Sequence, residues 1–239
     1  MRQTAPVTWE ALAGFAAGVR AAVPVVLGYL PIGFAFGVLA RTGGLSVLEI
    51  ALMSLLVYAG SAQFIGAGML AAGDPAGAIV STTFLVNLRH LLMSAALAPS
   101  FRGIRPAVGA LLGFELTDET FAVATAHLQG RPADPWWMAG LNLTSQATWV
   151  LASVAGGIFG EAIPDTRALG LDFALSAMFV ALLVLQLGSP EDRRGRRVRL
   201  GVALAAGVLT VAAGLLIPGR WNVILAAVVA AALGVWWER

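Results

Sequence analysis

The stretch FLVNLRHLLMSAAL places three polar side chains inside an otherwise apolar run: Asn87, Arg89 and His90. Spacings of three and four residues put four polar side chains on one stripe of a helix: Thr83, Asn87, His90 and Ser94. A charged side chain at the middle of a bilayer costs about 3 kcal/mol on insertion scales, so such a residue is a functional candidate. We therefore expect this stripe to face a polar interior and Arg89 to meet a charged partner there.

Three carboxylates in the next apolar segment are candidate partners for Arg89. The segment LGFELTDETFAVATAHL carries Glu115, Asp118 and Glu119, and on one continuous helix Glu115 would lie beside both of the others. Three carboxylates this close in a low dielectric do not all ionise, so we expect at least one to hold a proton near neutral pH, as proton coupling requires. Arg89 and His90 would neutralise the rest. The alternative is a static network in which two carboxylates balance Arg89 and the third lies near the interface.

Two further apolar segments contain residues that interrupt helices. The segment VPVVLGYLPIGFAFG holds prolines and glycines, and VYAGSAQFIGAGM places Gly60, Ser61 and Gln63 in the middle of an apolar run. Backbone that leaves helical geometry at bilayer depth is stable only where protein or a water-filled cavity satisfies it, and such helix ends form substrate sites in transporters. We therefore predict a site near Tyr58–Gln63. Close helix packing through small residues is the alternative for the glycines.

The composition indicates the environment of these segments. Of the 239 residues, 59% are hydrophobic and 12% are charged, with a mean hydropathy of +0.84. Several apolar stretches approach the roughly 20 residues that a helix needs to cross a bilayer. We predict an all-α polytopic membrane protein, a bundle of about seven or eight transmembrane helices with broken helices in the first and second spans. The expected spans are 21–40, 45–72, 75–98, 105–127, 136–160, 168–187, 198–217 and 221–237.

The expected organisation is one transmembrane domain, residues 21–239, after an N-terminal interfacial helix, residues 1–20. Apolar side chains such as Trp9 and Leu12 share one face of that helix. All 15 basic residues are arginine, and the cluster RRGRRVR is typical of a cytoplasmic loop under the positive-inside rule, with a site for anionic membrane lipids as the alternative. Arginine counting places the N-terminus in the cytoplasm, and we expect the protein in the cell's inner membrane.

Several classes of function are not expected from this sequence. Without cysteine there is no disulfide or thiol chemistry. The two histidines stand far apart, so no metal site is predicted, and YAGSAQF around Ser61 does not match the G-x-S-x-G elbow of serine hydrolases. Neither enzymatic activity nor a cofactor is expected. No nucleic-acid partner is expected either, because the high isoelectric point reflects the arginine content of a chain whose net charge is only +2.

Two later segments carry polar residues that have structural explanations. In LNLTSQATW, the side chains of Asn142, Ser145 and Trp149 share one helical face. Contacts between helices explain them as well as contacts with a substrate would. Asp172, near the start of the sixth expected span, suits a helix N-terminus because of the helix dipole.

Five motifs in the same order resemble those of the AzlC family of branched-chain amino acid permeases. They are LGYLPIGFAFG, YAGSAQF, NLRHLLMSAAL, TDETFA and GLDFALSAMF, and the resemblance covers residues 20–187. It implies an exporter of valine, leucine and isoleucine that is driven by the proton gradient. It also implies a partner, a small membrane subunit of the AzlD type.

The resemblance and the polar constellations together select the candidate site residues. Those expected to bind substrate are Pro31, Gly33, Tyr58, Gly60, Ser61, Gln63, Asn87 and Arg89. Those expected to couple protons are His90, Glu115, Asp118 and Glu119. The substrate carboxylate would lie at the broken helix or at Arg89, and the aliphatic group against Ala, Leu, Val and Phe side chains. Two alternatives are a passive channel and a membrane assembly subunit that transports nothing itself.

Overall fold

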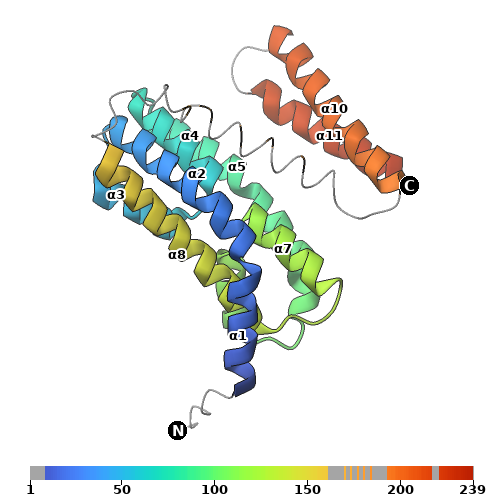
Figure 1. Cartoon of the computed structure of the whole chain (residues 1–239). Helices are drawn as coiled ribbons and strands as arrows, with labels where there is room; N and C mark the ends of the chain where they lie inside the picture. The colour runs from blue at the N-terminus through green and yellow to red at the C-terminus, as the bar shows by residue number, and fades with distance from the viewer. Residues whose placement is uncertain are drawn as a thin grey trace. The chain divides into compact units, whose positions relative to one another are not determined.

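The computed structural model describes residues 9–160, 193–216 and 221–238, with a few single positions between 170 and 184. These residues form helices joined by short turns, with no strand among them (Figure 1). The chain divides into two compact units, Met1–Met178 and Phe179–Arg239. The helices of the first unit are α1 (Trp9–Ala21), α2 (Val23–Thr42), α3 (Val47–Leu52), η1 (Met53–Val57), α4 (Gly60–Ala71), α5 (Ala76–Leu97), η2 (Ala98–Phe101), α6 (Pro106–Phe114), α7 (Asp118–Leu128) and α8 (Pro135–Phe159).

Helix α8 is the spine of the first unit, because α1 and α2 both pack along it (Figure 1). Small residues allow this close approach. A methyl group on Gly37 of α2 would overlap the carbonyl oxygen of Ser153, and one on Gly156 of α8 would overlap the carbonyl oxygen of Phe34. Helices that meet through glycine in this way pack backbone against backbone, as membrane helices commonly do.

Aromatic rings fill the space between α2, α4 and α8. The Tyr29 ring meets the Trp149 ring edge to face, with centroids 5.0 Å apart. Phe36 stacks on the other side of Trp149 at 6.1 Å and meets Phe64 of α4 at 5.5 Å. Aromatic pairs at these distances prefer offset or edge-to-face arrangements and add stability beyond their buried area. This cluster fixes the position of Trp149, which borders the candidate site.

The first expected span is a single helix, because α2 runs without interruption from Val23 to Thr42 with Pro31 inside it. The break predicted there from prolines and glycines is not seen. Proline removes one backbone donor, but neighbouring helices in a bundle can support the turn that it weakens. Glycine in this helix serves close packing against α8, which was the alternative explanation.

The second expected span divides into three parts. Helix α3 continues into η1, a π-helical turn, and the chain leaves helical geometry at Tyr58, whose φ of 42° is left-handed. Helix α4 then begins at Gly60. A left-handed φ is strained for a residue with a side chain, and such strain clusters at functional sites. The interruption places the N-terminus of α4 inside the unit.

The fourth expected span, residues 105–127, is not one continuous helix. Helix α6 ends at Phe114, and α7 begins at Asp118 after Thr117, which caps it. The Thr117 side chain accepts a hydrogen bond from the backbone N–H of Thr120, and the Thr120 side chain accepts one from the backbone N–H of Thr117. This reciprocal capping box starts a new helix without any proline or glycine at the break. The expectation that Glu115 shares a helical face with Asp118 and Glu119 is therefore wrong.

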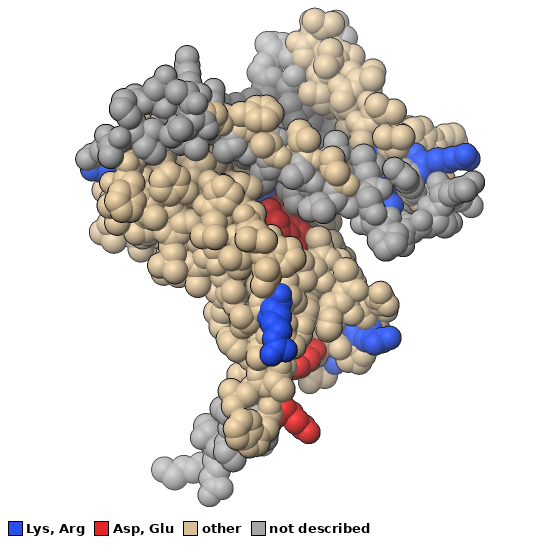
Figure 2. Space-filling model, viewed as in Figure 1, with Lys and Arg blue, Asp and Glu red and all other residues tan. Residues whose placement is uncertain are grey.

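Within the described residues, three helices are long and apolar enough to cross a membrane: Val23–Thr42, Ala76–Phe101 and Arg197–Leu215. The total of seven or eight spans stays a prediction, and the span expected at 168–187, including Asp172, lies almost wholly outside the described residues. Helix α5 exposes large apolar side chains, with Phe84, Leu91 and Leu92 each more than 60% accessible. Figure 2 shows few charged side chains among the described residues on its visible face. Such a surface suits a lipid environment.

The second unit contains α10 (Arg193–Leu216) and α11 (Trp221–Glu238), which pack on each other. Gly201 lies against the ring of Trp237, and Gly234 lies against the side chain of Val202. The cluster RRGRRVR, which we expected in a loop, forms the first turns of α10. Its cytoplasmic position stays a prediction.

Candidate functional site

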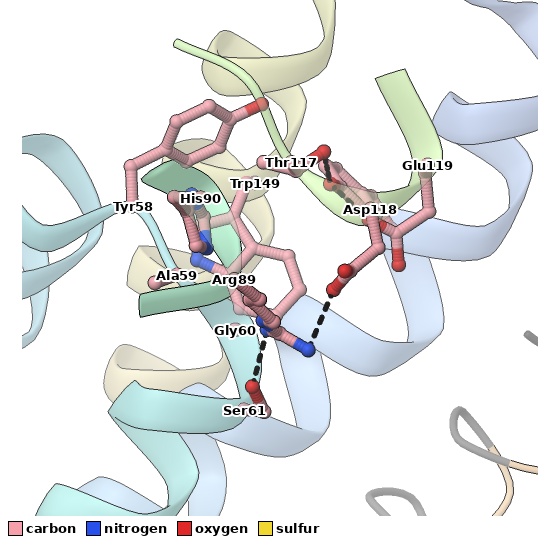
Figure 3. A pocket seen from close by; sticks show the side chains of 11 residues that line it. Tyr58, Ala59, Gly60, Ser61, Arg89, His90, Thr117, Asp118, Glu119 and Trp149 are labelled. Atoms are coloured by element: carbon pink, nitrogen blue, oxygen red, sulfur yellow. Dashed lines mark hydrogen bonds and ion pairs between the residues drawn. The ribbon is translucent and has the colours of Figure 1, made fainter. Parts of the chain in front are cut away.

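A polar pocket forms where the two helix breaks meet α5, α2 and α8. Its walls come from the start of α4, the start of α7, the middle of α5, and single aromatic residues of α2 and α8 (Figure 3). The cavity volume is about 10 Å³. A site needs about this much space to hold one water molecule, so in this conformation the pocket is too small for an amino acid.

Arg89 connects three segments that are distant in the sequence. Its Nη1 atom lies 2.8 Å from Oδ2 of Asp118, and its Nη2 atom donates a hydrogen bond to Oγ of Ser61 at 2.5 Å (Figure 3). The side chains of Arg89 and Asp118 are 27% and 19% exposed, so the ion pair is mostly shielded. Arg89 thus meets a carboxylate of the fourth expected span, as a charge inside an apolar segment requires.

Tyr29 of α2 holds the other carboxylate at the start of α7. Its hydroxyl lies 2.6 Å from Oγ1 of Thr117 and 2.8 Å from Oε2 of Glu119. Tyr29 and Thr117 are almost fully buried. The phenol and the carboxylate therefore share one shielded hydrogen-bond network with the cap of α7, and proton movement at Glu119 would disturb that network.

The N-terminus of α4 opens toward this pocket. The residue before the helix is Ala59, whose side chain makes no capping hydrogen bond. The first N–H groups of an α-helix have no partner within it, and they carry part of the positive end of the helix dipole. Gly60 and Ser61, the first residues of α4, line the pocket. This helix end is suited to an anionic group such as a carboxylate.

Several buried polar atoms around the pocket have no hydrogen-bond partner among the described residues. They are the hydroxyl of Tyr58, Nε of Arg89, Nε2 of His90 and Oδ1 of Asn87. Tyr58 is 2% exposed, so its hydroxyl has little access to solvent. An unsatisfied buried polar group costs about 1–3 kcal/mol. Tyr58, Arg89 and His90 line the pocket, so their atoms are available for hydrogen bonds to a ligand that enters it.

The structure brings most of the predicted site residues together. Seven of the predicted residues line the pocket: Tyr58, Gly60, Ser61, Arg89, His90, Asp118 and Glu119. Five others do not line it: Pro31, Gly33, Gln63, Asn87 and Glu115.

The residues outside the pocket have other surroundings. Pro31 is exposed, and Gly33 packs against Ala152 and the Trp149 backbone. Gln63 is fully buried: it accepts a hydrogen bond from the Trp149 indole at 2.9 Å and donates one to Ser54 at 3.1 Å. Gln63 thus supports the pocket wall through Trp149 rather than facing the cavity.

Asn87 and Glu115 also lie beside the pocket rather than in its lining. Asn87 is partly buried on α5. Glu115 directly follows the last residue of α6, where it caps the helix, and it is 6% exposed. The break before α7 separates it from Asp118 and Glu119, so a coupling role for Glu115 would have to act from outside the cavity.

Four pocket residues were not selected from the sequence: Tyr29, Ala59, Thr117 and Trp149. Tyr29 and Tyr58 are the only two tyrosines of the chain, and both stand in apolar runs near a glycine, which is a signal for buried hydroxyl groups. Thr117 precedes two acidic residues, a pattern typical of a helix start. For Trp149 the sequence left contacts between helices and contacts with a substrate both open, and the structure gives it contacts with α2 and a place in the pocket lining.

The fold and the pocket together define a class of protein: an all-helical chain with membrane-length apolar helices around a shielded charged site. A family model described as AzlC protein matches residues 24–163 of this chain. The chain belongs to the AzlC family.

Curated relatives agree with this class. The chain is 36% identical over 183 residues to the inner membrane protein YgaZ of Escherichia coli strain K12. These residues are 72% of this chain and 73% of that protein. It is 34% identical to an uncharacterized membrane protein of Archaeoglobus fulgidus, over 93% of this chain and 94% of the relative. It is 29% identical to the branched-chain amino acid transport protein AzlC of Bacillus subtilis strain 168, over 82% of this chain and 77% of the relative. No solved structure matches the chain.

Proposed function

We propose that this protein is a secondary transporter that exports branched-chain amino acids across the cell membrane in exchange for protons. The observation that carries the proposal is the contact of Arg89 with both Asp118 and Ser61 in a closed pocket between two helix breaks. The relative in Bacillus subtilis is named for branched-chain amino acid transport, which supports the choice of substrate.

The pocket has complementary groups for an amino acid zwitterion. Arg89 and the open N-terminus of α4 suit the substrate carboxylate, because both present positive charge or free N–H groups. Asp118 and Glu119 suit the ammonium group. Without substrate, Arg89 and Asp118 neutralise each other at 2.8 Å. A zwitterion that enters between them would replace one ion pair with two, so neither charge would be left unpaired.

Proton coupling follows from the same two carboxylates. A proton that reaches Asp118 or Glu119 from the outer side removes the negative charge that holds the substrate ammonium. Substrate affinity then falls on the side where protons are abundant. The amino acid leaves there, and the proton travels inward with the empty site. This exchange moves substrate out and protons in.

The small size of the pocket supports a carrier rather than an open pore. Its cavity of about 10 Å³ has to widen before an amino acid enters. The breaks before α4 and α7 are suited to such movement, because each helix ends at the site and its first turn can shift separately. A passive channel would need a continuous path instead.

The proposal also includes a place and a partner. Relatives are described as membrane proteins, and we propose the cell membrane with a cytoplasmic N-terminus. A small AzlD-type subunit is proposed as the transport partner. Reconstitution of this chain alone, and then with that subunit, tests the partner directly, because transport that is complete without it would exclude an essential role.

Valine counterflow tests whether the protein is a carrier. Proteoliposomes loaded with unlabelled valine should take up external labelled valine transiently above its equilibrium level, because a carrier exchanges one substrate for another. A channel gives only equilibration. An assembly subunit without transport activity gives no uptake above empty liposomes.

A further inference from the structure

We propose that Trp149 is the wall against which the substrate's aliphatic side chain packs, and that Gly60 sets the space in front of it. This inference rests on the proposed transport of branched-chain amino acids. It assigns the selectivity among these amino acids to the ring of Trp149 and to the absence of a side chain at Gly60. Both residues line the pocket.

The pocket is lined by charged residues and by aromatic rings. Arg89 of α5 and the two carboxylates of α7 are charged, and Trp149 and Tyr58 provide rings (Figure 3). A third ring is that of Tyr29, whose hydroxyl lies beside Glu119. Of the Ala, Leu, Val and Phe side chains expected around the cavity, Ala59 lines it in this conformation, and no Leu, Val or Phe does. An amino acid held by its charged groups must therefore turn its aliphatic group toward the rings.

Trp149 is held in place by a hydrogen bond and by aromatic contacts. Its indole N–H donates a hydrogen bond to Oε1 of Gln63 at 2.9 Å, and the amide of Gln63 donates one to Ser54 at 3.1 Å. Tyr29 packs on it edge to face, and Phe36 stacks beside it. The indole is 2% exposed. A ring fixed from several sides cannot move aside for a larger ligand, so it can select by size.

Gly60 faces the benzene ring of this indole. A methyl group at Gly60 would lie 3.1 Å from Cη2 and 3.3 Å from Cζ2 of Trp149. These distances are shorter than ordinary carbon contacts of about 3.5–4.0 Å, so a methyl group would force the ring or the start of α4 to shift and would reshape the aromatic part of the pocket. Glycine at this position lets the start of α4 lie against the ring without that shift.

The test measures the ratio of leucine to valine transport in competition, using purified protein in proteoliposomes. One methylene in an apolar pocket is worth about tenfold or more in selectivity. In Gly60→Ala we expect the leucine-to-valine ratio to fall about tenfold relative to wild type. The matched control is Gly68→Ala, the same change on the same helix at an exposed position where a methyl group meets nothing within 4 Å.

A second variant should change the leucine-to-valine ratio in the opposite direction. Trp149→Phe shortens the wall, so the ratio should rise in favour of leucine. This variant carries the test if Gly60→Ala is not recovered as folded protein. Ratios that stay within about twofold of wild type in folded variants would overturn the inference, since a tenfold effect is expected for a methylene-sized change. Wild-type protein that transports neither amino acid would instead reject the proposed function itself, and the inference with it.

Discussion

Arg89 of α5 and Asp118 of α7 form an ion pair of 2.8 Å, and the same guanidinium binds Ser61 of α4. One arginine therefore joins three helices at the point where two of them begin. A charge in such a position is stable because its partner is present, and it becomes costly when the partner is removed. We therefore expect the stability of the first unit and the proposed binding of substrate to depend on the same contact.

The ion pair predicts that removing one charge destabilises the protein and that removing both restores most of its stability. Arg89→Gln leaves Asp118 without its partner, and we expect a loss of about 2 kcal/mol in the free energy of unfolding, below the 3–5 kcal/mol of a fully buried pair because both side chains are partly exposed. The double variant Arg89→Gln with Asp118→Asn should recover most of this stability but no transport. Unfolding in detergent measures the first effect and valine flux the second. A double variant as unstable as the single one would contradict the account.

Ser61 predicts an effect on substrate affinity. Its hydroxyl accepts a hydrogen bond from the charged Arg89, and bonds to charged groups are worth about 1.5–3 kcal/mol. Ser61→Ala should raise KM for valine about tenfold with little change in maximal rate, because Arg89 is less well oriented for the carboxylate. The control is Ser81→Ala on α5, where an exposed hydroxyl bonds only the backbone of its own helix. Equal KM values in both variants would show that Ser61 does not position Arg89.

Tyr29 predicts an effect on the pH profile. Tyr29→Phe removes the hydroxyl that lies 2.8 Å from Glu119, so the charged carboxylate loses a hydrogen bond that stabilises it. The pH at which valine transport is half-maximal should move upward, because Glu119 then takes up its proton more readily. The control is Thr125→Val on α7, which removes an exposed hydroxyl bonded to its own helix. A profile that does not move would separate Glu119 from proton coupling.

The close packing of α2 on α8 predicts opposite effects for two glycines of α2. Gly37→Ala forces a methyl group onto the Ser153 carbonyl and should destabilise the protein by about 2 kcal/mol. Gly28→Ala meets nothing within 4 Å and should stabilise it by about 0.5–1 kcal/mol, because alanine favours the helix. Thermal unfolding of the two purified variants gives both signs. Destabilisation by both changes would mean that backbone flexibility of α2 matters more than packing.

Much of the helix pattern could be predicted from hydropathy and length. The third and fifth expected spans, residues 75–98 and 136–160, match α5 and α8 within a residue. The break at Tyr58 lies inside a motif that was selected because polar residues accompany glycine there. Periodicity was sufficient in these places because apolar composition and helix length point to the same element.

Other features depend on contacts that a single sequence does not display. The expected break at Pro31 is absent, since α2 stays helical along α8. The break at Thr117 was missed because it comes from a reciprocal threonine cap and not from glycine or proline. Gln63 was assigned to substrate binding, but its partners are Ser54 of the neighbouring π-helical turn and Trp149, which is distant in the sequence. Hydrogen bonds between segments decide which polar residues face the cavity.

Valine flux driven by a pH gradient tests the central claim most directly. Inside-out vesicles with an acidic interior should accumulate labelled valine above its external concentration, and an uncoupler should abolish this accumulation. Asp118→Asn and Glu119→Gln, tested separately and together, should remove the dependence on the gradient. Valine accumulation in wild-type vesicles that ignores the gradient, or variants that both keep the full dependence, would contradict proton-coupled export through this pocket.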